Sequence, residues 1–203
     1  MTHGAALQHL KRADPVMAKV IAEVGPCRFQ PVAESSHFHH IARAIVFQQL
    51  STKAAATIFG RLRALCGESL EPEAVLAQKD EALRAVGLSS SKTKYVKDLA
   101  ARVRDGSLHL DALPAMEDAE IVAELTKVKG IGVWSAQMFL IFRLGRPNIL
   151  PILDLGIQKG VQRAYGLRRL PKPAYVARVG KRWSPHATIA SWYLWRSLDG
   201  PAG

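Results

Sequence analysis

Apolar residues recur along this chain with the period of an amphipathic α-helix, most clearly on either side of a glycine turn. The residues that repeat at spacings of three and four are Ile121, Val122, Leu125 and Val128 before the turn, and Val133, Ala136, Phe139 and Leu140 after it. The turn itself is Gly130-Ile131-Gly132. This pattern predicts two helices joined by a tight hairpin over about residues 119–144.

Helical periodicity continues through the rest of the chain, and no segment shows the alternation of a half-buried strand. Residues suited to a helix start or first turn are Ser35, Ser36, Pro72, Asp80, Ser89, Asp154 and Pro185. Glycines suited to a helix end are Gly87, Gly106 and Gly166. The connections are short, and there is no repeat or low-complexity linker. The pattern therefore predicts an all-α protein.

Composition and charge narrow the class of partner. The chain has 203 residues, of which 48% are hydrophobic, so it can bury a substantial core. Its 28 basic and 17 acidic residues give a formal charge of +11, which indicates a polyanionic partner without distinguishing DNA, RNA and an anionic membrane. No apolar run approaches the length of a membrane-spanning helix, and the N-terminus does not resemble a secretory signal. We expect no membrane partner and a cytoplasmic location, associated with the nucleoid in a bacterium, or a nuclear location in a eukaryote.

Cysteine and histidine give little sign of a metal centre. Cys27 and Cys66 are too few for a disulfide framework or a four-cysteine zinc site, and we expect both to be reduced. His37, His39 and His40 form a cluster, but no cysteine or carboxylate stands near them at a ligand-like spacing. A solvated helix start explains this cluster better.

The glycine hairpin has the features of a phosphate-binding element. Gly130 and Gly132 permit backbone angles that a side chain would forbid, so the backbone can approach a partner closely. Amide N–H groups at the start of the next helix suit an anion, and Lys127 and Lys129 add positive charge. A short glycine pattern alone also fits a plain turn, so its context decides.

The segment Gln48-Gln49-Leu50 is unusual because it places two amides inside an otherwise apolar helical stretch. The amides can simply cap a helix end. In a protein that opens DNA, the same side chains can fill the gap left by an extruded nucleotide and hydrogen-bond the orphaned base.

Four tryptophans stand in the C-terminal third, at Trp134, Trp183, Trp192 and Trp195. Aromatic residues at helical spacing usually belong to the core, and we place Trp195 there. Trp134 and Trp192 are candidates for stacking on an electron-poor or cationic base. Phe47 would border the same pocket.

Five segments together resemble the 3-methyladenine DNA glycosylase II family of the helix–hairpin–helix superfamily. They run in the family's order and cover roughly residues 35–198: Arg43 to Ser51, Gly87 to Tyr95, Lys129 to Ala136, Pro151 to Gly156 and Ser191 to Trp195. The resemblance implies two mostly helical lobes, interleaved over residues 1–203, with the active site in the cleft between them. It also implies that the additional N-terminal β domain of larger bacterial members is absent, because this chain starts close to the helical core.

The resemblance also assigns residues. Asp154 matches the catalytic aspartate, and Gly130, Ile131 and Gly132 match the hairpin. Such hairpins often hold Na⁺ or K⁺ through backbone carbonyls, and the matching positions are Thr126, Val128 and Ile131, with the Ser135 hydroxyl nearby.

Three positions qualify the match. Members that also cleave the DNA backbone carry a lysine two residues after the second hairpin glycine, where this chain has Trp134, so no lyase activity at abasic sites is expected. Ala187 stands where a basic residue is usual, and Asn148 stands where an acid is common.

The combined prediction is a monomeric, monofunctional DNA glycosylase of base excision repair that removes alkylated purines, such as 3-methyladenine and 7-methylguanine, from double-stranded DNA. It would require no cofactor. Asp154 would be catalytic, Gln48, Gln49 and Leu50 would hold the opened duplex, and Phe47, Trp134 and Trp192 would line or border the base pocket. Two alternatives remain open: a glycosylase for oxidised or deaminated bases, and a non-catalytic binder of damaged or bent DNA.

Overall fold

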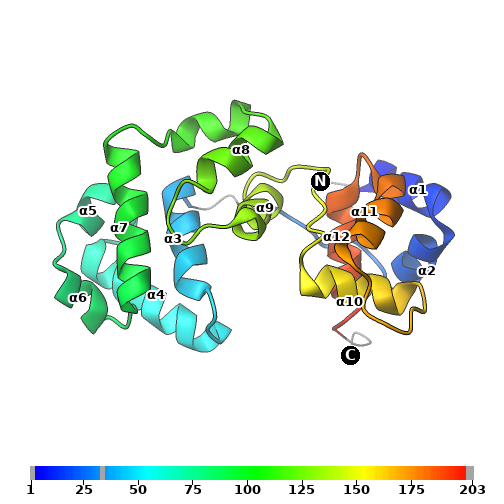
Figure 1. Ribbon diagram of the computed structural model, residues 1–203, viewed down its shortest axis with the longest axis horizontal. Coiled ribbons are helices and arrows are strands. Elements are labelled where there is room, and N and C mark those ends of the chain that lie inside the picture. Colours follow the sequence, from blue (N-terminus) through cyan, green and yellow to red (C-terminus); the bar gives the residue numbers. More distant parts are fainter. Residues whose placement is uncertain (1–2, 33–34, 200–203) are drawn as a thin grey trace. The chain divides into compact units, whose positions relative to one another are not determined.

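The computed structural model describes residues 3–32 and 35–199, and within these ranges it contains helices and no strand (Figure 1). The all-α prediction is confirmed for this part of the chain. The α-helices are α1 (Gly4–Ala13), α2 (Pro15–Val24), α3 (His37–Phe47), α4 (Thr52–Cys66), α5 (Pro72–Leu76), α6 (Asp80–Ala85), α7 (Ser90–Arg104), α8 (Asp118–Leu125), α9 (Val133–Phe142), α10 (Leu155–Ala164), α11 (Pro173–Gly180) and α12 (Ala187–Arg196). Two 3₁₀ helices span Leu110–Ala115 and Lys181–Trp183.

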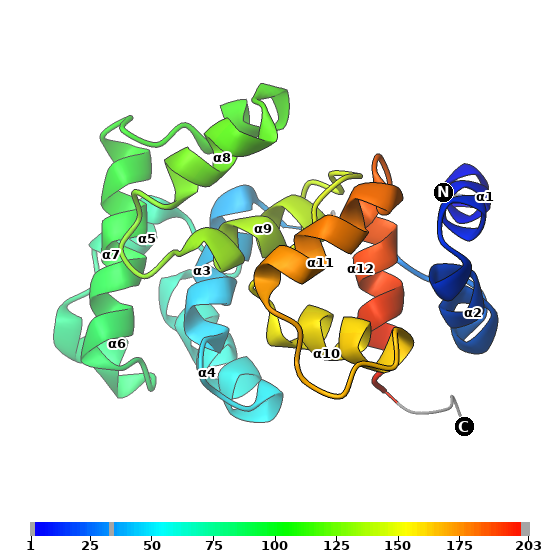
Figure 2. The same cartoon turned by 45° about the vertical axis from the view of Figure 1, so that its right-hand side comes forward.

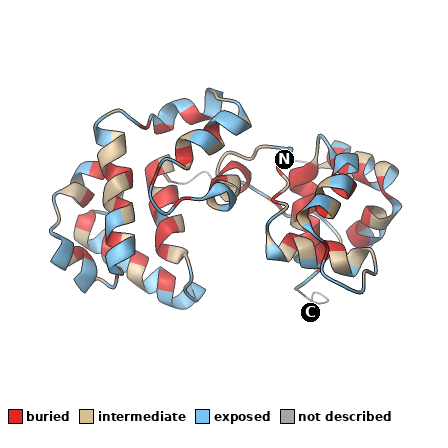
Figure 3. Ribbon diagram, in the orientation of Figure 1, coloured by how far each residue is buried: buried red, intermediate tan, exposed pale blue. Residues whose placement is uncertain are grey.

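The helices belong to two compact units. The central unit spans Val32–Phe139, and the terminal unit combines Met1–Pro31 with Leu140–Gly203. The boundary falls within α9. Each unit has its own buried stripes along the facing sides of its helices (Figure 3).

The terminal unit is built around the close approach of α10 and α12. A Cβ atom added to Gly160 would lie 2.8 Å from the Leu194 carbonyl oxygen, so only glycine permits this spacing. Trp183 and Tyr193 are fully buried and are the largest side chains of this core. Tight packing therefore fixes the position of α12 relative to α10.

In the central unit, α7 packs against both α3 and α5, and it lies beside α3 in Figures 1 and 2. Leu62 on α4, Leu83 on α6 and Leu99 on α7 are fully buried in the core of this unit. The arrangement places α7 next to the end of α3 and the chain segment that follows it.

Local signals located several helix starts correctly. The hydroxyls of Ser36 and Ser89 accept the backbone N–H groups of His39 and Lys92, at 3.1 and 3.2 Å. Ser51, which was not predicted as a cap, accepts the Ala54 N–H at 3.3 Å in the same way. Pro72 begins α5, and Asp154 caps α10.

Two predictions about helix starts need correction. Asp80 is the first residue of α6 but does not cap it, because the Lys79 carbonyl accepts the first helical N–H, from Leu83, and so places Lys79 at the cap. Pro185 does not begin α12, because the His186 carbonyl accepts the first helical N–H, from Ala190, and so places His186 at the cap. Helices α1, α2 and α11 were not anticipated.

None of the helices in the described ranges combines the length and hydropathy that crossing a lipid bilayer requires.

Candidate functional site

Asp154 is held at the first turn of α10 by two hydrogen bonds. Its Oδ1 accepts the backbone N–H of Ile157 at 2.7 Å and the indole N–H of Trp195 at 2.8 Å. The two N–H groups fix the orientation of the carboxylate. The side chain is half-buried, so the carboxylate is restrained and is not sealed within the core.

Gly156 makes room for this arrangement. A Cβ atom at position 156 would lie 2.8 Å from Trp195 Cδ1 and 2.9 Å from Asp154 Oδ1. The Trp195 ring also stacks on Phe142, with centroids 5.6 Å apart and planes at 28°. The sequence Asp154-Leu155-Gly156 therefore supplies the carboxylate together with the space that its indole donor occupies.

The assignment of Trp195 to the core is wrong. Its side chain is half-buried, and its indole N–H points to the carboxylate. Trp183 is the fully buried tryptophan of this unit. Helical spacing alone could not show which of Trp183 and Trp195 is buried. The one available signal was that Trp195 follows Trp192 by three residues, which places both on one side of α12.

The three aromatic residues predicted for the base pocket belong to different units. Phe47 ends α3 in the central unit, with the Arg43 guanidinium 3.9 Å from its ring centroid. Trp134 lies in the first turn of α9 in the same unit and is 46% exposed. Trp192 is in the terminal unit, edge-on to Tyr193 at 4.9 Å. Their common role in a pocket stays a prediction.

The glycine hairpin has the expected tight geometry. The Ile131 N–H donates to the Val128 carbonyl at 3.0 Å, and Gly130 has φ +82°. A Cβ atom on Gly130 would lie 2.2 Å from a ring atom of Tyr95, whereas one on Gly132 would meet nothing within 4 Å. Gly130 is therefore needed for packing within the protein, while the missing side chain of Gly132 leaves the backbone accessible to a partner.

Both hairpin lysines lie beside carboxylates. Lys127 pairs with Glu124, and Lys129 Nζ lies 3.4 Å from Asp98 Oδ1. The lysine side chains remain 51% and 68% exposed. Their ammonium groups are thus accessible to a phosphate, and Asp98 would keep its hydrogen bonds from Arg102 and the Lys129 backbone N–H if the Lys129 side chain moved.

The segment Gln48-Gln49-Leu50-Ser51 forms the turn between α3 and α4, and we call it the polar loop. The Gln48 side-chain amide donates to the Gly130 carbonyl at 2.9 Å. Gln49 adopts φ +56° and is exposed, and Leu50 is 41% exposed. Of the three residues predicted to hold an opened duplex, Gln48 is thus engaged within the protein, while Gln49 and Leu50 form the outer part of the loop.

The carbonyl groups predicted to hold a monovalent cation belong to Thr126, Val128 and Ile131, all within the hairpin. The Val128 oxygen already accepts one N–H, but a carbonyl oxygen has a second lone pair. Oxygen donors of this kind suit Na⁺ or K⁺.

In the described ranges there is no cluster of three or more His, Cys, Asp or Glu side chains placed for a metal ion. The rings of His37 and His40 lie edge-on to Phe139, and that of His39 to Phe59.

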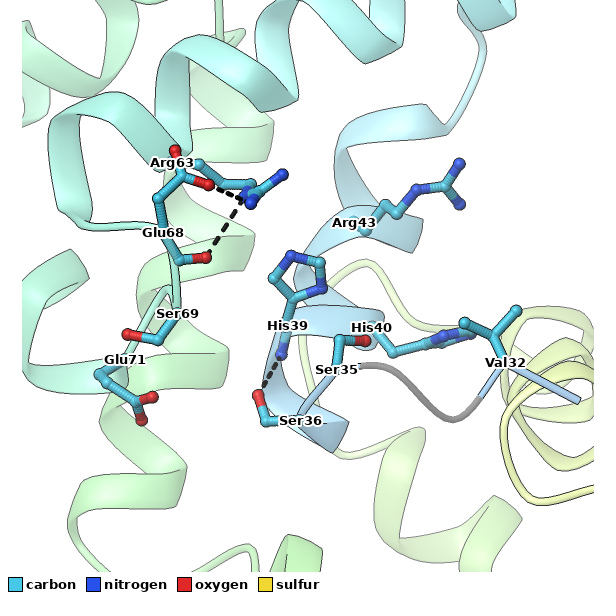
Figure 4. A pocket seen from close by; sticks show the side chains of 10 residues that line it. All are labelled: Val32, Ser35, Ser36, His39, His40, Arg43, Arg63, Glu68, Ser69 and Glu71. Carbon is cyan, nitrogen blue, oxygen red and sulfur yellow. Dashed lines mark hydrogen bonds and ion pairs between the residues drawn. The ribbon is translucent and has the colours of Figure 1, made fainter.

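A cavity of about 720 Å³ lies in the central unit beside the first half of α3 (Figure 4). His39, Arg43 and Arg63 line it, and Arg63 is paired with Glu68. None of the residues predicted for catalysis or DNA binding lines this cavity.

The two departures from the family pattern lie against each other. Asn148 Oδ1 accepts the Ala187 backbone N–H at 3.4 Å, and its amide donates to the Ser184 hydroxyl at 3.2 Å. The acid usual at position 148 and the basic residue usual at position 187 are therefore both absent. Since Asn148 and Ala187 are both neutral, neither change leaves an unpaired charge at this contact.

Comparison with known proteins agrees with the motifs. Residues 42–186 match the family model of the HhH-GPD superfamily base excision DNA repair proteins. A putative DNA-3-methyladenine glycosylase of Bacillus subtilis is 33% identical over 83% of this chain and 61% of its own length. DNA-3-methyladenine glycosylase 1 of Schizosaccharomyces pombe is 32% identical over 93% of this chain and 85% of its own length.

Solved structures show the same relationship. The crystal structure of a DNA-3-methyladenine glycosidase from Bacillus halodurans superposes with a TM-score of 0.87 at 34% identity, covering 96% of this chain and 89% of that one. The S. pombe 3-methyladenine DNA glycosylase in complex with abasic DNA gives 0.82 at 30% identity, covering 94% and 95%. The chain therefore belongs to the HhH-GPD superfamily of base excision DNA repair proteins and, within it, to the 3-methyladenine DNA glycosylase family.

Proposed function

We propose that this protein is a monofunctional DNA glycosylase that hydrolyses the N-glycosidic bond of alkylated purines, including 3-methyladenine and 7-methylguanine. The observation that carries the proposal is the Asp154 carboxylate, held by the Ile157 amide and the Trp195 indole at the position of the family's catalytic aspartate. The relatives named as 3-methyladenine glycosylases support the choice of alkylated bases.

A single carboxylate is sufficient for this reaction. Breaking the N-glycosidic bond develops positive charge on the deoxyribose, and a nearby fixed negative charge stabilises it or activates the attacking water. A purine alkylated at a ring nitrogen already carries positive charge and leaves as a neutral molecule. The protein therefore needs no general acid for the leaving base, unlike most glycosidases. This difference favours alkylated purines over neutral lesions.

We further propose that no lyase step follows. Cleaving the backbone through a Schiff base requires an amine at the sugar, and the position that carries this lysine in bifunctional relatives is Trp134 here. An aromatic side chain at this position is available instead for stacking on the extruded base.

DNA would be bound by the central unit through two elements. The hairpin would receive a backbone phosphate at Gly132 and the N–H groups at the start of α9, with Lys127 and Lys129 adding charge and the hairpin carbonyls holding Na⁺ or K⁺. Gln49 and Leu50 would enter the duplex, because Gln48 is engaged with Gly130. Phe47, Trp134 and Trp192 would receive the base.

The test compares the native chain with Asp154→Asn on methylated duplex DNA. We expect release of 3-methyladenine and 7-methylguanine by the native chain, and a fall of at least about 100-fold in the variant, because a fixed charge at the reacting centre contributes on this scale. Asparagine still accepts the Ile157 N–H, so binding to abasic DNA should be retained.

Two further results would redirect the proposal. Release of neutral oxidised or deaminated bases, with none from methylated DNA, would assign a different lesion class. Binding without any release would make the protein a non-catalytic reader of damaged DNA. A covalent adduct trapped by borohydride would overturn the absence of a lyase step.

A further inference from the structure

We propose that α7 acts as a brace that fixes the polar loop relative to the hairpin, and that Lys92 is the positioning residue through which it holds the loop for opening the duplex. The inference rests on the proposed roles of these two segments. All the contacts that carry it lie within the central unit.

Lys92 binds the carbonyl end of α3. Its ammonium donates to the Val46 carbonyl at 2.8 Å and the Gln48 carbonyl at 2.7 Å. The C-terminal end of a helix carries partial negative charge on unsatisfied carbonyls, so a cation is stabilising there. Burial lowers the pKa of Lys92, in keeping with an amine directed into the protein. Lys92 of α7 thus binds two carbonyl groups just before the exposed part of the polar loop, those of Val46 and Gln48.

Two other residues of α7 hold the hairpin. The Tyr95 ring lies directly against Gly130, where a Cβ atom would come within 2.2 Å of it. Asp98 accepts the Lys129 backbone N–H at 3.0 Å. Burial acts to raise the pKa of Asp98, but hydrogen bonds from Lys129 and Arg102 leave it below its ordinary value. Because Lys92, Tyr95 and Asp98 follow one another at three-residue intervals, a single helix reaches both segments.

Gln48 closes the connection directly. Its side chain donates to the carbonyl of Gly130, the residue against which Tyr95 packs. The loop and the hairpin are therefore joined twice, once by this hydrogen bond and once through α7.

The loop conformation explains the need for a brace. Gln49 has φ +56°, which for a residue with a side chain costs about 1–2 kcal/mol and persists only where the surroundings impose it. Residues that enter a duplex must also resist the stacked bases that they separate. When the hairpin is bound to a DNA phosphate, α7 would hold the polar loop in a fixed position relative to that phosphate. Binding of the DNA backbone and opening of the base pair would then be coupled.

The experiment compares Lys92→Met with Lys94→Met. Both remove one positive charge from α7, but Lys94 is exposed and lies two residues from Lys92. Single-turnover release is measured on an alkylated purine in two duplexes, opposite its normal partner and opposite an abasic position, where no pair has to be opened. A 2-aminopurine beside the lesion reports opening by its fluorescence.

We expect Lys92→Met to slow release from the paired duplex by about 10-fold, since small misplacements of positioning groups have effects of this order. Release from the unpaired duplex should stay within about twofold of native, and Lys94→Met should match native on both. The 2-aminopurine signal should fall only for Lys92→Met. Equal slowing on both duplexes would mean a general structural role and would overturn the proposal, as would identical behaviour of the two variants.

A second variant covers the case in which Lys92→Met folds poorly. Gln48→Met cuts the direct link to Gly130 while keeping the side-chain length, and it should show the same preference for the unpaired duplex. Equal rates on both duplexes would count against the brace. A native chain that opens the duplex without releasing a base would refute the proposed chemistry, while a 2-aminopurine signal lowered only by Lys92→Met would still support the brace, so the two failures are distinguishable.

Discussion

The terminal unit contains two aspartates with the same local design and different environments. Asp14 caps α2 and accepts the backbone N–H groups of Val16 and Met17, and its other oxygen accepts the Trp183 indole N–H at 2.9 Å and the Tyr165 hydroxyl. Asp154 likewise caps a helix and accepts an indole N–H, at 2.8 Å. Asp14 is completely buried, whereas Asp154 is half-buried.

The difference shows that a capping aspartate with an indole donor is not in itself a catalytic feature. Donors within the core occupy both oxygens of Asp14, so no substrate can reach it. Asp154 accepts the Ile157 and Trp195 N–H groups but is only half-buried. Its neighbours Leu153 and Leu155 are 64% and 53% exposed, so the segment faces outward. Accessibility separates a stabilising carboxylate from one that can act on a substrate.

Removing each carboxylate in turn is the most direct test of whether Asp14 and Asp154 have different roles. We expect Asp14→Ala to lower the free energy of unfolding by about 3–5 kcal/mol, because it removes a helix cap and leaves the buried Trp183 and Tyr165 donors unpaired. Asp154→Ala should cost only about 1 kcal/mol, the value of a cap, while abolishing base release. Urea unfolding and single-turnover assays measure the two effects. Comparable loss of stability in both variants would remove the distinction.

The indole donors provide a matched pair. Trp195→Phe removes the hydrogen bond to Asp154 but keeps a ring to stack on Phe142, and we expect base release to fall by about 10-fold, which corresponds to about 1.4 kcal/mol, the upper end for an ordinary hydrogen bond. Trp183→Phe removes the corresponding bond to Asp14 and should lower stability by about 1–3 kcal/mol with the release rate per folded molecule unchanged. An inactive Trp183→Phe that remains folded would contradict the assignment.

Gly156→Ala tests whether space beside Asp154 matters. The new methyl group would displace the Trp195 ring or the carboxylate, and we expect release to slow by roughly fivefold with little change in melting temperature. Gly60→Ala is the control, because a Cβ atom there meets nothing within 4 Å. Unchanged release by Gly156→Ala would show that the position of the indole is not critical.

The smallest expected effect is on alkaline stability at the Asp14 site. Burial, together with the hydrogen bond to Asp14 and its negative charge, raises the pKa of Tyr165 above its ordinary value of 10.0. The folded state therefore keeps this proton when the unfolded state loses it, so the contribution is complete below about pH 10 and declines as the pH rises further.

The control for this effect is Tyr165→Phe. We expect its free energy of unfolding to fall less steeply above about pH 10 than that of the native chain, by up to about 1.4 kcal/mol per pH unit. Burial also raises the pKa of Tyr193, to about 12, but Tyr193 is present in both proteins and cancels in the difference. Parallel curves would show that Tyr165 does not titrate in the expected way.

The sequence predicted those features that depend on residues close together in the chain. Ser36 and Ser89 cap helices because a hydroxyl reaches an N–H three residues later, and the hairpin forms where glycine permits φ +82° at position 130. The Asp14-Pro15 pair is a helix start of the same kind, with the carboxylate at the cap and proline at the first helical position, and it was not among the predicted starts.

The tertiary structure decided which of the candidate residues face one another. Trp195 reaches Asp154 across 41 positions, Gln48 reaches Gly130 across 82, and Lys92 reaches Gln48 across 44. Such contacts depend on how helices pack, which follows from the summed burial of many side chains and not from any short motif. The sequence by itself therefore determined most of the helices, the hairpin and the candidate aspartate Asp154, while packing decided that the indole of Trp195, and not that of Trp183, reaches this carboxylate.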